Sequence, residues 1–382
     1  MGRIKPIPGK RYIILLIIVI LLVLNGVLLF VSDSRNQTEK AMSNDTMVEV
    51  VNENDKVNQL IITGLDETLN DCIPGIVCWG DSLTARGWPK DFELILKEGV
   101  LSPLNKEIQM IIAEYRINIP VINMGVGSET SAMITARSGA EPYKIASEII
   151  IPENCSEIDI DIVMSDGTEA RNVKFGWPGL ERVSINGIDG TISSEFDGMK
   201  IVAYKFKRKE PGKAMVVDAG TNIITNGAVL YQNYIPVIFM GTNGGYGDDP
   251  KELIRQQQAI IDYSTSPAGK YIIVGLHTGN KDIRNNLENA MENAWGDHYI
   301  NLREYLSTNA LNEMGIEATS EDIEMMKNGE TPASLLEADG LHFTSTGYQI
   351  IAQLVYDRMM QLHFFDEIFD AVDKVVSEYS VK

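Results

Sequence analysis

The chain has 382 residues and a formal net charge of −20 at neutral pH. Hydrophobic residues make up 44% of the sequence and charged residues 23%, which is typical of a globular protein and excludes an intrinsically disordered one. The acidity argues against a nucleic-acid-binding protein, because such proteins need a basic face to neutralise phosphates. Three cysteines exclude a disulfide-stabilised scaffold, and no Cys or His cluster has zinc-ligand spacing, so we expect no metal.

The N-terminal region predicts a membrane anchor. Residues 1–11 carry four basic and no acidic side chains, whereas the rest of the chain has a net charge of −24. The apolar run Ile13 to Val31 spans about 28 Å as a helix, close to the thickness of the hydrocarbon core. Basic residues before such a run place the N-terminus in the cytoplasm. We therefore expect a cytoplasmic tail over 1–11, a single transmembrane helix over 12–32, a polar tether over 33–57 and an extracellular remainder.

A cleaved signal peptide is the alternative for this region. Its apolar core is usually only about 7–15 residues long and ends in small residues at the cleavage site. The run here is longer, and it ends in Leu29-Phe30-Val31-Ser32 without such a site. The sequence therefore favours the uncleaved anchor.

The rest of the chain alternates between strand-like and helical patterns. Short apolar runs that end near glycine or polar residues predict buried parallel strands at Ile73–Trp79, Val121–Gly125, Ile235–Gly241 and Tyr271–Leu276. Helical periodicity follows over Pro250–Tyr263, Asp282–Ala294, Thr346–Leu362 and Asp366–Tyr379. Strands alternating with helices indicate an α/β fold with a parallel sheet covered on both faces. In such folds the functional groups gather at the carboxyl ends of the strands.

The segment 141–228 interrupts this alternation. Residues 157–162 alternate strictly between polar and apolar, as in a strand with one exposed face, and Met199–Phe206 and Ala214–Val217 continue the strand character. The pairs Asp166-Gly167, Asn186-Gly187 and Asp189-Gly190 are hairpin signals. We predict an antiparallel β-rich subdomain over 141–228, inserted into an α/β domain that comprises 58–140 and 229–382.

Four loops at the ends of predicted elements contain residues suited to acyl transfer. Ser82 follows the first strand, where a sharp turn into a helix exposes the hydroxyl. Gly125 and Asn243 follow two other strands, where a backbone N–H and an amide can bind an oxyanion. Asp339 precedes His342 by three residues, so its carboxylate can orient the imidazole toward a nucleophile. Each of the first three loops alone would be interpreted as an ordinary turn.

Together, in this order, the four loops resemble those of the SGNH (GDSL-type) hydrolase family. The matching residues are Ser82, Gly125, Asn243 and His342, with Asp339 as the acid, in segments that include Gly80-Asp81-Ser82-Leu83-Thr84 and DGLHFTSTG at 339–347. The resemblance implies a three-layer α/β/α fold of flavodoxin-like type and ester hydrolysis without metal or cofactor. It also implies a catalytic triad of Ser82, His342 and Asp339 and an oxyanion hole of Ser82, Gly125 and Asn243. Many members carry Asp after the Asn of the third loop, where this chain has Gly244.

The expected substrate is an acylated small molecule or glycan, preferably a carbohydrate with an acetyl group, because an extracellular enzyme meets exported glycans. Trp79, Arg86, Trp88 and Tyr246 flank the catalytic loops and are candidates for substrate binding, although large aromatic residues are equally common in cores. Two alternatives remain. One is a non-catalytic surface module that binds glycan or protein, and the other is a thioesterase or lipid esterase that uses the same triad.

Overall fold

The computed structural model describes residues 58–69, 73, 75–198, 200–278 and 281–380. The chain divides into two units, 1–64 and 65–382, and the described part of the first unit, 58–64, is helical. The predicted tail, transmembrane helix and tether lie outside the described residues. Within the described ranges, no helix is long and apolar enough to cross a membrane.

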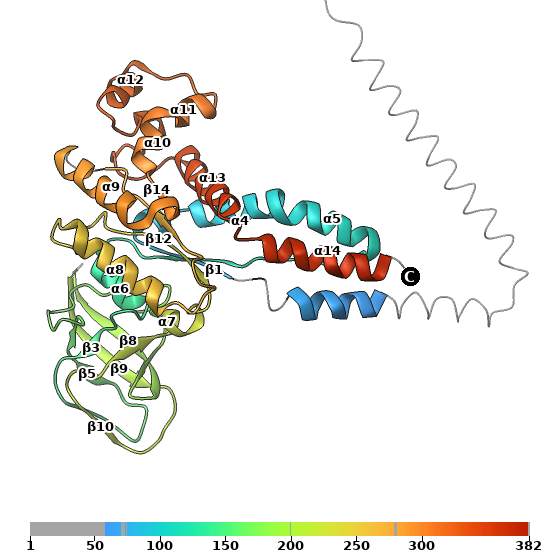
Figure 1. Cartoon of the computed structure of the whole chain (residues 1–382). Helices are drawn as coiled ribbons and strands as arrows, with labels where there is room; N and C mark the ends of the chain where they lie inside the picture. Colours follow the sequence, from blue (N-terminus) through green and yellow to red (C-terminus); the bar gives the residue numbers. More distant parts are fainter. Residues whose placement is uncertain (1–57, 70–72, 74, 199, 279–280, 381–382) are drawn as a thin grey trace, which may run out of the picture. The chain divides into compact units, whose positions relative to one another are not determined.

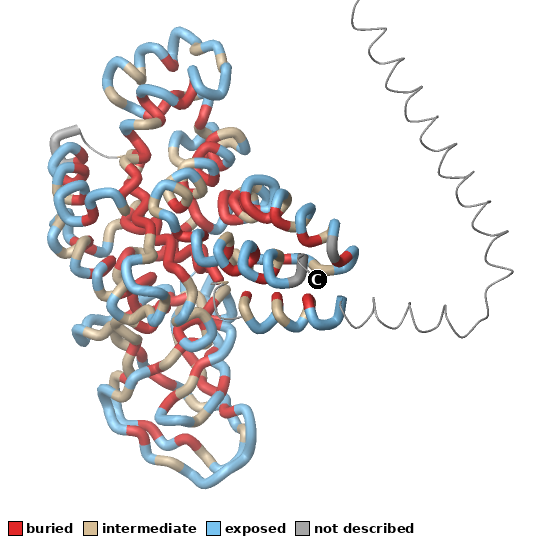
Figure 2. Tube along the Cα trace, turned by 45° about the vertical axis from the view of Figure 1, so that its right-hand side comes forward, coloured by how far each residue is buried: buried red, intermediate tan, exposed pale blue. Residues whose placement is uncertain are grey.

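The second unit contains a five-stranded parallel sheet (Figure 1). Its strands are β1 (Ile76–Gly80), β2 (Val121–Gly125), β12 (Ile235–Phe239), β13 (Ile272–Val274) and β14 (Tyr299–Ile300). They lie in the order β14-β13-β12-β1-β2, which along the chain is the flavodoxin-like order 2-1-3-4-5. Every residue of β1 and β12 is buried, as the red central strands in Figure 2 show, so these strands appear in the sequence as continuous apolar runs. The four predicted strands are confirmed, and β14 was not predicted.

Helices pack against this sheet in two groups. Helices α4 (Trp88–Leu96) and α13 (Ser345–Gln361) contact each other; α4 also contacts β2, and α13 also contacts β13 and β14. Helices α6 (Ser131–Arg137), α8 (Pro250–Tyr263) and α9 (Lys281–Trp295) contact β1, β12 and β14. Side chains alternate between the faces of a strand, and Val77 and Trp79 of β1 share a core cluster with Leu253 of α8. The sheet is thus covered by helices, as a buried parallel sheet requires.

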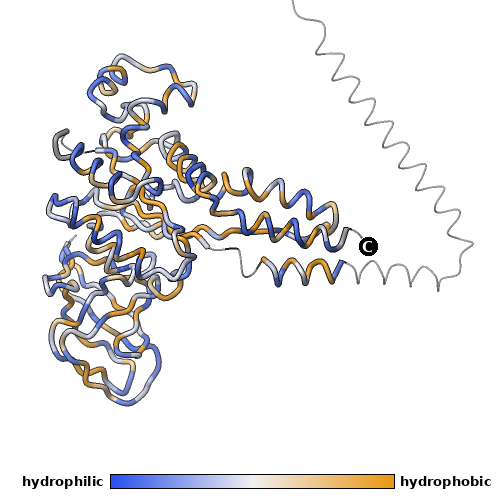
Figure 3. Tube along the Cα trace, viewed as in Figure 1, coloured by the Kyte–Doolittle hydropathy of each residue, from blue (hydrophilic) through white to orange (hydrophobic). Residues whose placement is uncertain are grey.

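The sequence predicted several helices closely. Helix α8 has the predicted bounds, because Asp249 caps its first turn by accepting a hydrogen bond from the Lys251 N–H and Pro250 follows. Helices α9, α13 and α14 (Asp366–Ser380) agree with their predictions to within one residue at each end. In Figure 3, α14 alternates between apolar and polar residues along its length. The remaining helices are α3 (Ser82–Ala85), the π-helix η2 (Lys97–Leu101), α5 (Ser102–Ile111), α7 (Asn226–Leu230), α10 (Leu302–Thr308), α11 (Ala310–Glu313) and α12 (Ser320–Lys327), with short 3₁₀ turns η3 (Gly296–His298) and η4 (Ala333–Leu335).

Antiparallel strands fill the region between α6 and α7. The larger sheet has the order β11-β7-β8-β9-β5, from β5 (Ile158–Ile160), β7 (Val183–Ile185), β8 (Ile188–Asp197), β9 (Lys200–Arg208) and β11 (Ile223–Thr225). Two smaller sheets pair β4 (Ile149–Ile151) with β10 (Met215–Val217) and β3 (Lys144–Ile145) with β6 (Ile162–Val163). Their core includes Met133 and Ala136 of α6, so the antiparallel region packs directly on the α/β part. The predicted antiparallel strands are confirmed.

Two of the three predicted hairpin turns are present, and one is wrong. Asn186 and Gly187 join β7 to β8 with positive φ angles of 50° and 77°, as a two-residue hairpin requires. Asp166-Gly167 also forms a turn, in which the Thr168 carbonyl accepts from the Met164 N–H. Gly190, in contrast, lies inside β8, where a Cβ atom would come within 2.4 Å of the Phe206 ring. The glycine there permits close packing and makes no turn.

Candidate active site

The nucleophile candidate Ser82 lies where β1 ends and α3 begins. Asp81 caps this helix, because its Oδ1 atom accepts a hydrogen bond from the Leu83 N–H at 2.9 Å. Gly80 is required before it, since a Cβ atom there would lie 2.1 Å from Thr84 Oγ1 and 2.5 Å from the Phe239 carbonyl oxygen. The turn therefore presents Ser82 as the first residue of the helix, half-buried, at the carboxyl edge of the sheet.

The loop before α13 brings His342 to Ser82 across 260 residues of sequence. His342 Nε2 lies 2.9 Å from Ser82 Oγ, and His342 Nδ1 lies 2.6 Å from Asp339 Oδ2. Asp339 also accepts the backbone N–H groups of Leu341 and His342 on Oδ1, at 3.0 and 2.9 Å. The His342 side chain and then these two N–H groups hold the pKa of the Asp339 carboxyl well below its usual range. The three residues thus form one continuous chain of hydrogen bonds.

Buried residues fix the shape of this loop. Phe343 is fully buried, and its ring lies 4.3 Å from the imidazole of His277 and 5.6 Å from Tyr348, between centroids. The His277 carbonyl oxygen accepts a hydrogen bond from the Thr331 hydroxyl at 3.3 Å. Burial lowers the pKa of His277 to about 4, so this imidazole is neutral at physiological pH. His277 therefore packs behind the loop as an uncharged ring.

Asn243 lies in the loop after β12. Its amide nitrogen donates to the Glu129 carbonyl at 3.0 Å, which ties the loop after β12 to the loop after β2. Gly244, where the resembling family often has Asp, has a φ of 72°, and its carbonyl accepts both the N–H and the hydroxyl of Ser131. These two bonds hold the loop without an aspartate side chain.

The donor role expected of Gly125 does not fit its geometry. The Gly125 N–H donates to Asn123 Oδ1 at 2.9 Å and so already has an acceptor. A Cβ atom at Gly125 would lie 2.1 Å from the backbone nitrogen of Ala85, so the glycine is needed for packing of β2 against α3. The next loop residues are closer to the nucleophile, because a Cβ atom at Gly127 would lie 3.7 Å from Ser82 Cβ. Ser128 follows with a φ of 67°, rare for a residue other than glycine.

The four residues expected to bind substrate separate into two groups. Trp79 and Trp88 are buried in the core, and Tyr246, which is 9% exposed, belongs to the same core cluster as Trp79. The core alternative therefore holds for these three residues, and a substrate-binding role for the two tryptophans is wrong. Trp79 instead packs against the buried Arg137, whose guanidinium carbon lies 5.2 Å from the ring centroid. Arg86 is exposed and forms an ion pair with Glu337 at 2.7 Å.

Glu337, Asp339 and His342 are close enough together to hold a cation, since one ligand atom from each lies within 4.8 Å of the others. Asp339 and His342, however, are bonded to each other, and Glu337 is paired with Arg86. The possible ligand atoms of this cluster are therefore already engaged in hydrogen bonds or an ion pair, and the cluster does not indicate a metal centre.

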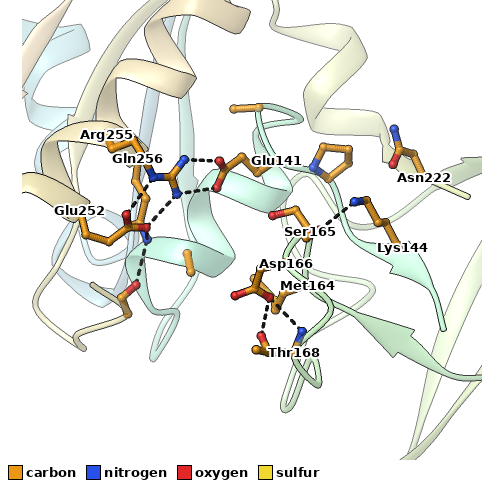
Figure 4. Close-up of a pocket in the computed structure, with 14 residues that line it drawn as sticks. Glu141, Lys144, Met164, Ser165, Asp166, Thr168, Asn222, Glu252, Arg255 and Gln256 are labelled. Atoms are coloured by element: carbon orange, nitrogen blue, oxygen red, sulfur yellow. Dashed lines mark hydrogen bonds and ion pairs between the residues drawn. The ribbon is translucent and has the colours of Figure 1, made fainter. Parts of the chain in front are cut away.

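A separate cavity of about 630 Å³ lies between the antiparallel region and helices α6 and α8 (Figure 4). None of Ser82, Asn243, Asp339 and His342 lines it. Its charged side chains already have partners: Arg255 contacts both Glu141 and Glu252. Lys144 donates to the Ser165 carbonyl at 2.7 Å, and Asp166 accepts from the Thr168 hydroxyl at 2.7 Å. We assign no role in the chemistry to this cavity.

Comparison with known proteins adds little to this geometry. No family model matches the sequence, and no curated protein matches it. One solved structure, described as a peptidoglycan O-acetylesterase in action, aligns with 79% of this chain and 95% of its own, at 13% identity and a TM-score of 0.27. The function is therefore argued from the site itself.

Proposed function

We propose that this protein is a serine esterase of the SGNH type that removes small acyl groups, acetyl above all, from carbohydrate. The observation that carries the proposal is the hydrogen-bonded series Asp339–His342–Ser82, with distances of 2.6 and 2.9 Å. A carboxylate on one ring nitrogen and a hydroxyl on the other is the arrangement that activates a serine for acyl transfer.

Each residue of this series has a defined task in the proposed reaction. His342 Nε2 removes the proton of Ser82 Oγ as the oxygen attacks the ester carbonyl. Asp339, ionised because its pKa is lowered, fixes Nδ1 as the protonated ring nitrogen and stabilises the imidazolium. His342 then protonates the leaving alkoxide, and the acyl group remains on Ser82. In the second half of the reaction His342 activates water, which releases the carboxylic acid.

The tetrahedral intermediate needs donors for its oxyanion. The Ser82 N–H is one, because the first N–H groups of a helix have no partner within the helix. The Asn243 amide is the second, since only one of its two hydrogens is directed to the Glu129 carbonyl. In place of Gly125, we assign the third donor to the backbone at Gly127 and Ser128, whose N–H groups have no acceptor among the described residues.

The location of the enzyme is also part of the proposal. The positive charge of residues 1–11, the apolar run over 12–32 and the acidic remainder support a single-pass protein of the cell membrane with its catalytic part outside. An enzyme in that position meets exported glycans, and an acidic surface disfavours polyanionic ones. Neutral acylated saccharides are therefore the preferred substrate class.

The test is hydrolysis of p-nitrophenyl acetate by the purified full-length chain and by S82A. We expect S82A to lose turnover to the background level, because it lacks the nucleophile. S377A, which removes an exposed hydroxyl from α14, is the matched control and should retain full activity. Unchanged turnover in S82A would refute the proposal. Wild-type protein that binds saccharide without hydrolysing any ester would favour the non-catalytic binding module. A preference for thioesters or long acyl chains would favour the thioesterase or lipid esterase.

A further inference from the structure

Trp177 differs from the other tryptophans of this chain. It is 49% exposed, whereas Trp79, Trp88 and Trp295 are at most 5% exposed. Between residues 151 and 195, all of which are described, it is also the only large hydrophobic side chain that is exposed. An indole left half in solvent has an apolar face without a partner, and tryptophan is enriched at binding surfaces for this reason.

Trp177 belongs to the antiparallel region, yet its neighbour Lys174 contacts the catalytic loops. Lys174 Nζ donates to the Gly127 carbonyl, and the same atom lies 5.2 Å from the centroid of the Trp177 ring. Gly127 is the residue whose α-carbon faces the Cβ atom of Ser82. Lys174 and Gly127 therefore link the indole to the loop that faces the nucleophile. One face of the ring is occupied by the ammonium group, which agrees with the half exposure of the side chain.

The turn that carries Trp177 is held rigidly. The Leu180 N–H donates to the Trp177 carbonyl at 2.7 Å, and the Gly176 N–H donates to the Leu180 carbonyl at 3.0 Å. The Pro178 carbonyl accepts from the buried Arg137 at 3.3 Å. Because these bonds fix the backbone on both sides of Trp177, binding of a ligand there costs little backbone entropy.

We propose that Trp177 forms a saccharide-binding subsite of the esterase, on which the pyranose ring that carries the ester stacks. This inference rests on the proposed function. A pyranose presents a face of C–H groups to an aromatic ring and hydroxyl groups at its rim, so it matches a single indole in polar surroundings. A long acyl chain would need several exposed apolar side chains side by side, and no other large hydrophobic side chain in the described residues 151–195 is exposed. The antiparallel region thereby supplies substrate selectivity to a site whose chemistry lies in the α/β part.

The experiment compares two substrates in the full-length chain: an acetylated cello-oligosaccharide and p-nitrophenyl acetate, which has no sugar. We expect W177A to raise KM for the saccharide about 10-fold or more, because tryptophans in binding sites are commonly worth that much. Its kcat/KM for p-nitrophenyl acetate should stay within about 2-fold of wild type, since the triad and the three oxyanion donors are intact. W177F retains an aromatic face and should recover most of the saccharide KM. F196A, which removes another exposed aromatic side chain from the antiparallel region, should leave the kinetic constants for both substrates unchanged.

Binding without turnover provides a second readout. In S82A, addition of the acetylated saccharide should perturb the emission of Trp177, because the other three tryptophans are buried. The perturbation should be absent in S82A/W177A.

Several outcomes would overturn the inference. An unchanged saccharide KM in W177A would do so, as would equal losses on both substrates or a selective loss on p-nitrophenyl octanoate, which would indicate an acyl-chain site. Turnover of p-nitrophenyl acetate but not of the saccharide by the wild-type chain would also contradict it. The proposed function fails separately, if S82A keeps its turnover.

Discussion

Arg137 and Glu129 form an ion pair that solvent does not reach. Arg137 Nη2 lies 2.6 Å and Nε 2.9 Å from Glu129 Oε2, and the two side chains are 0% and 1% exposed. Arg137 is the last residue of helix α6, and Glu129 lies in the loop after β2. The backbone carbonyl of Glu129 accepts a hydrogen bond from the Asn243 amide. The guanidinium also donates to the Gly80 carbonyl, two residues before Ser82, and to the Pro178 carbonyl. One buried cation thus links three segments of the candidate site.

The first prediction concerns the stability that depends on this pair. R137M keeps much of the side-chain volume but leaves the buried Glu129 carboxylate without the partner that donates its hydrogen bonds. Removing one partner of a buried pair typically costs about 3–5 kcal/mol, so we expect a loss of unfolding free energy of that size. Denaturant unfolding of the full-length chain, followed by circular dichroism, measures it.

The matched control for R137M is R171M. Arg171 pairs with Glu169 at 2.6 Å, but these side chains are 74% and 65% exposed. Water and salt screen an exposed pair, so it contributes little to stability and R171M should be nearly neutral. The double variant R137M/E129M should be more stable than R137M, because it carries no unpaired buried charge. Equal small effects of R137M and R171M would show that the buried pair does not organise the site.

The second prediction concerns pH and Asp81. Burial raises the pKa of the Asp81 carboxyl to about 6, and the Leu83 N–H and the Thr242 hydroxyl oppose this effect only in part. A folded-state pKa above the unfolded value means that stability is lost as pH rises between the two values, here from about 4 to about 6. D81N stays neutral and keeps an oxygen for the helix cap. Its stability relative to wild type should therefore rise by up to about 3 kcal/mol between pH 4 and pH 7.

Thermal unfolding of both proteins at the two pH values tests this expectation. D166N is the control of opposite sign, because the Thr168 N–H and hydroxyl lower the pKa of Asp166. The stability that the ionised Asp166 carboxylate contributes is present at neutral pH and is lost as pH falls. The unfolding free energy of D166N relative to wild type should therefore decrease as pH rises. If the difference between D81N and wild type were independent of pH, the raised pKa of Asp81 would be wrong.

The sequence predicted those parts of the fold whose pattern is long or strongly marked. Strands β1 and β12 are buried on both faces and appear as unbroken apolar runs, and α8 is marked by Asp249 and Pro250 at its start. Strand β14, with the residues Tyr299 and Ile300 alone, is too short to produce a period. The hairpin at Asp189-Gly190 was predicted wrongly, because the sequence does not distinguish a glycine that makes room for Phe206 from a glycine in a turn.

The same limit applies to the candidate site. Asp339 and His342 were found because their contact is local, three residues apart on one loop. Gly125 was assigned as a donor, although its lack of a Cβ atom serves packing against Ala85, and sequence does not separate these two uses of glycine. Trp79 and Trp88 flank the loops in sequence but are buried in the core, whereas Trp177 lies 95 residues from Ser82 along the chain. The Gly and Pro residues on either side of Trp177 were the available signal, since an aromatic residue in a turn is often exposed.

The last prediction concerns Asn243, whose role remains a prediction. If its amide binds the oxyanion, N243A should lower kcat on p-nitrophenyl acetate by about 100- to 1000-fold with little change in KM, because the bond forms only in the transition state. N293A is the matched control: Asn293 also donates its amide to a backbone carbonyl, that of Asn289 at 2.7 Å, but it lies on α9. The variant N243A also loses the bond to the Glu129 carbonyl, so unfolding of both variants is measured in parallel. A fall in kcat without a matching fall in unfolding temperature assigns the effect to the oxyanion. A loss of kcat that follows the loss of stability would instead make Asn243 a residue that positions the loop.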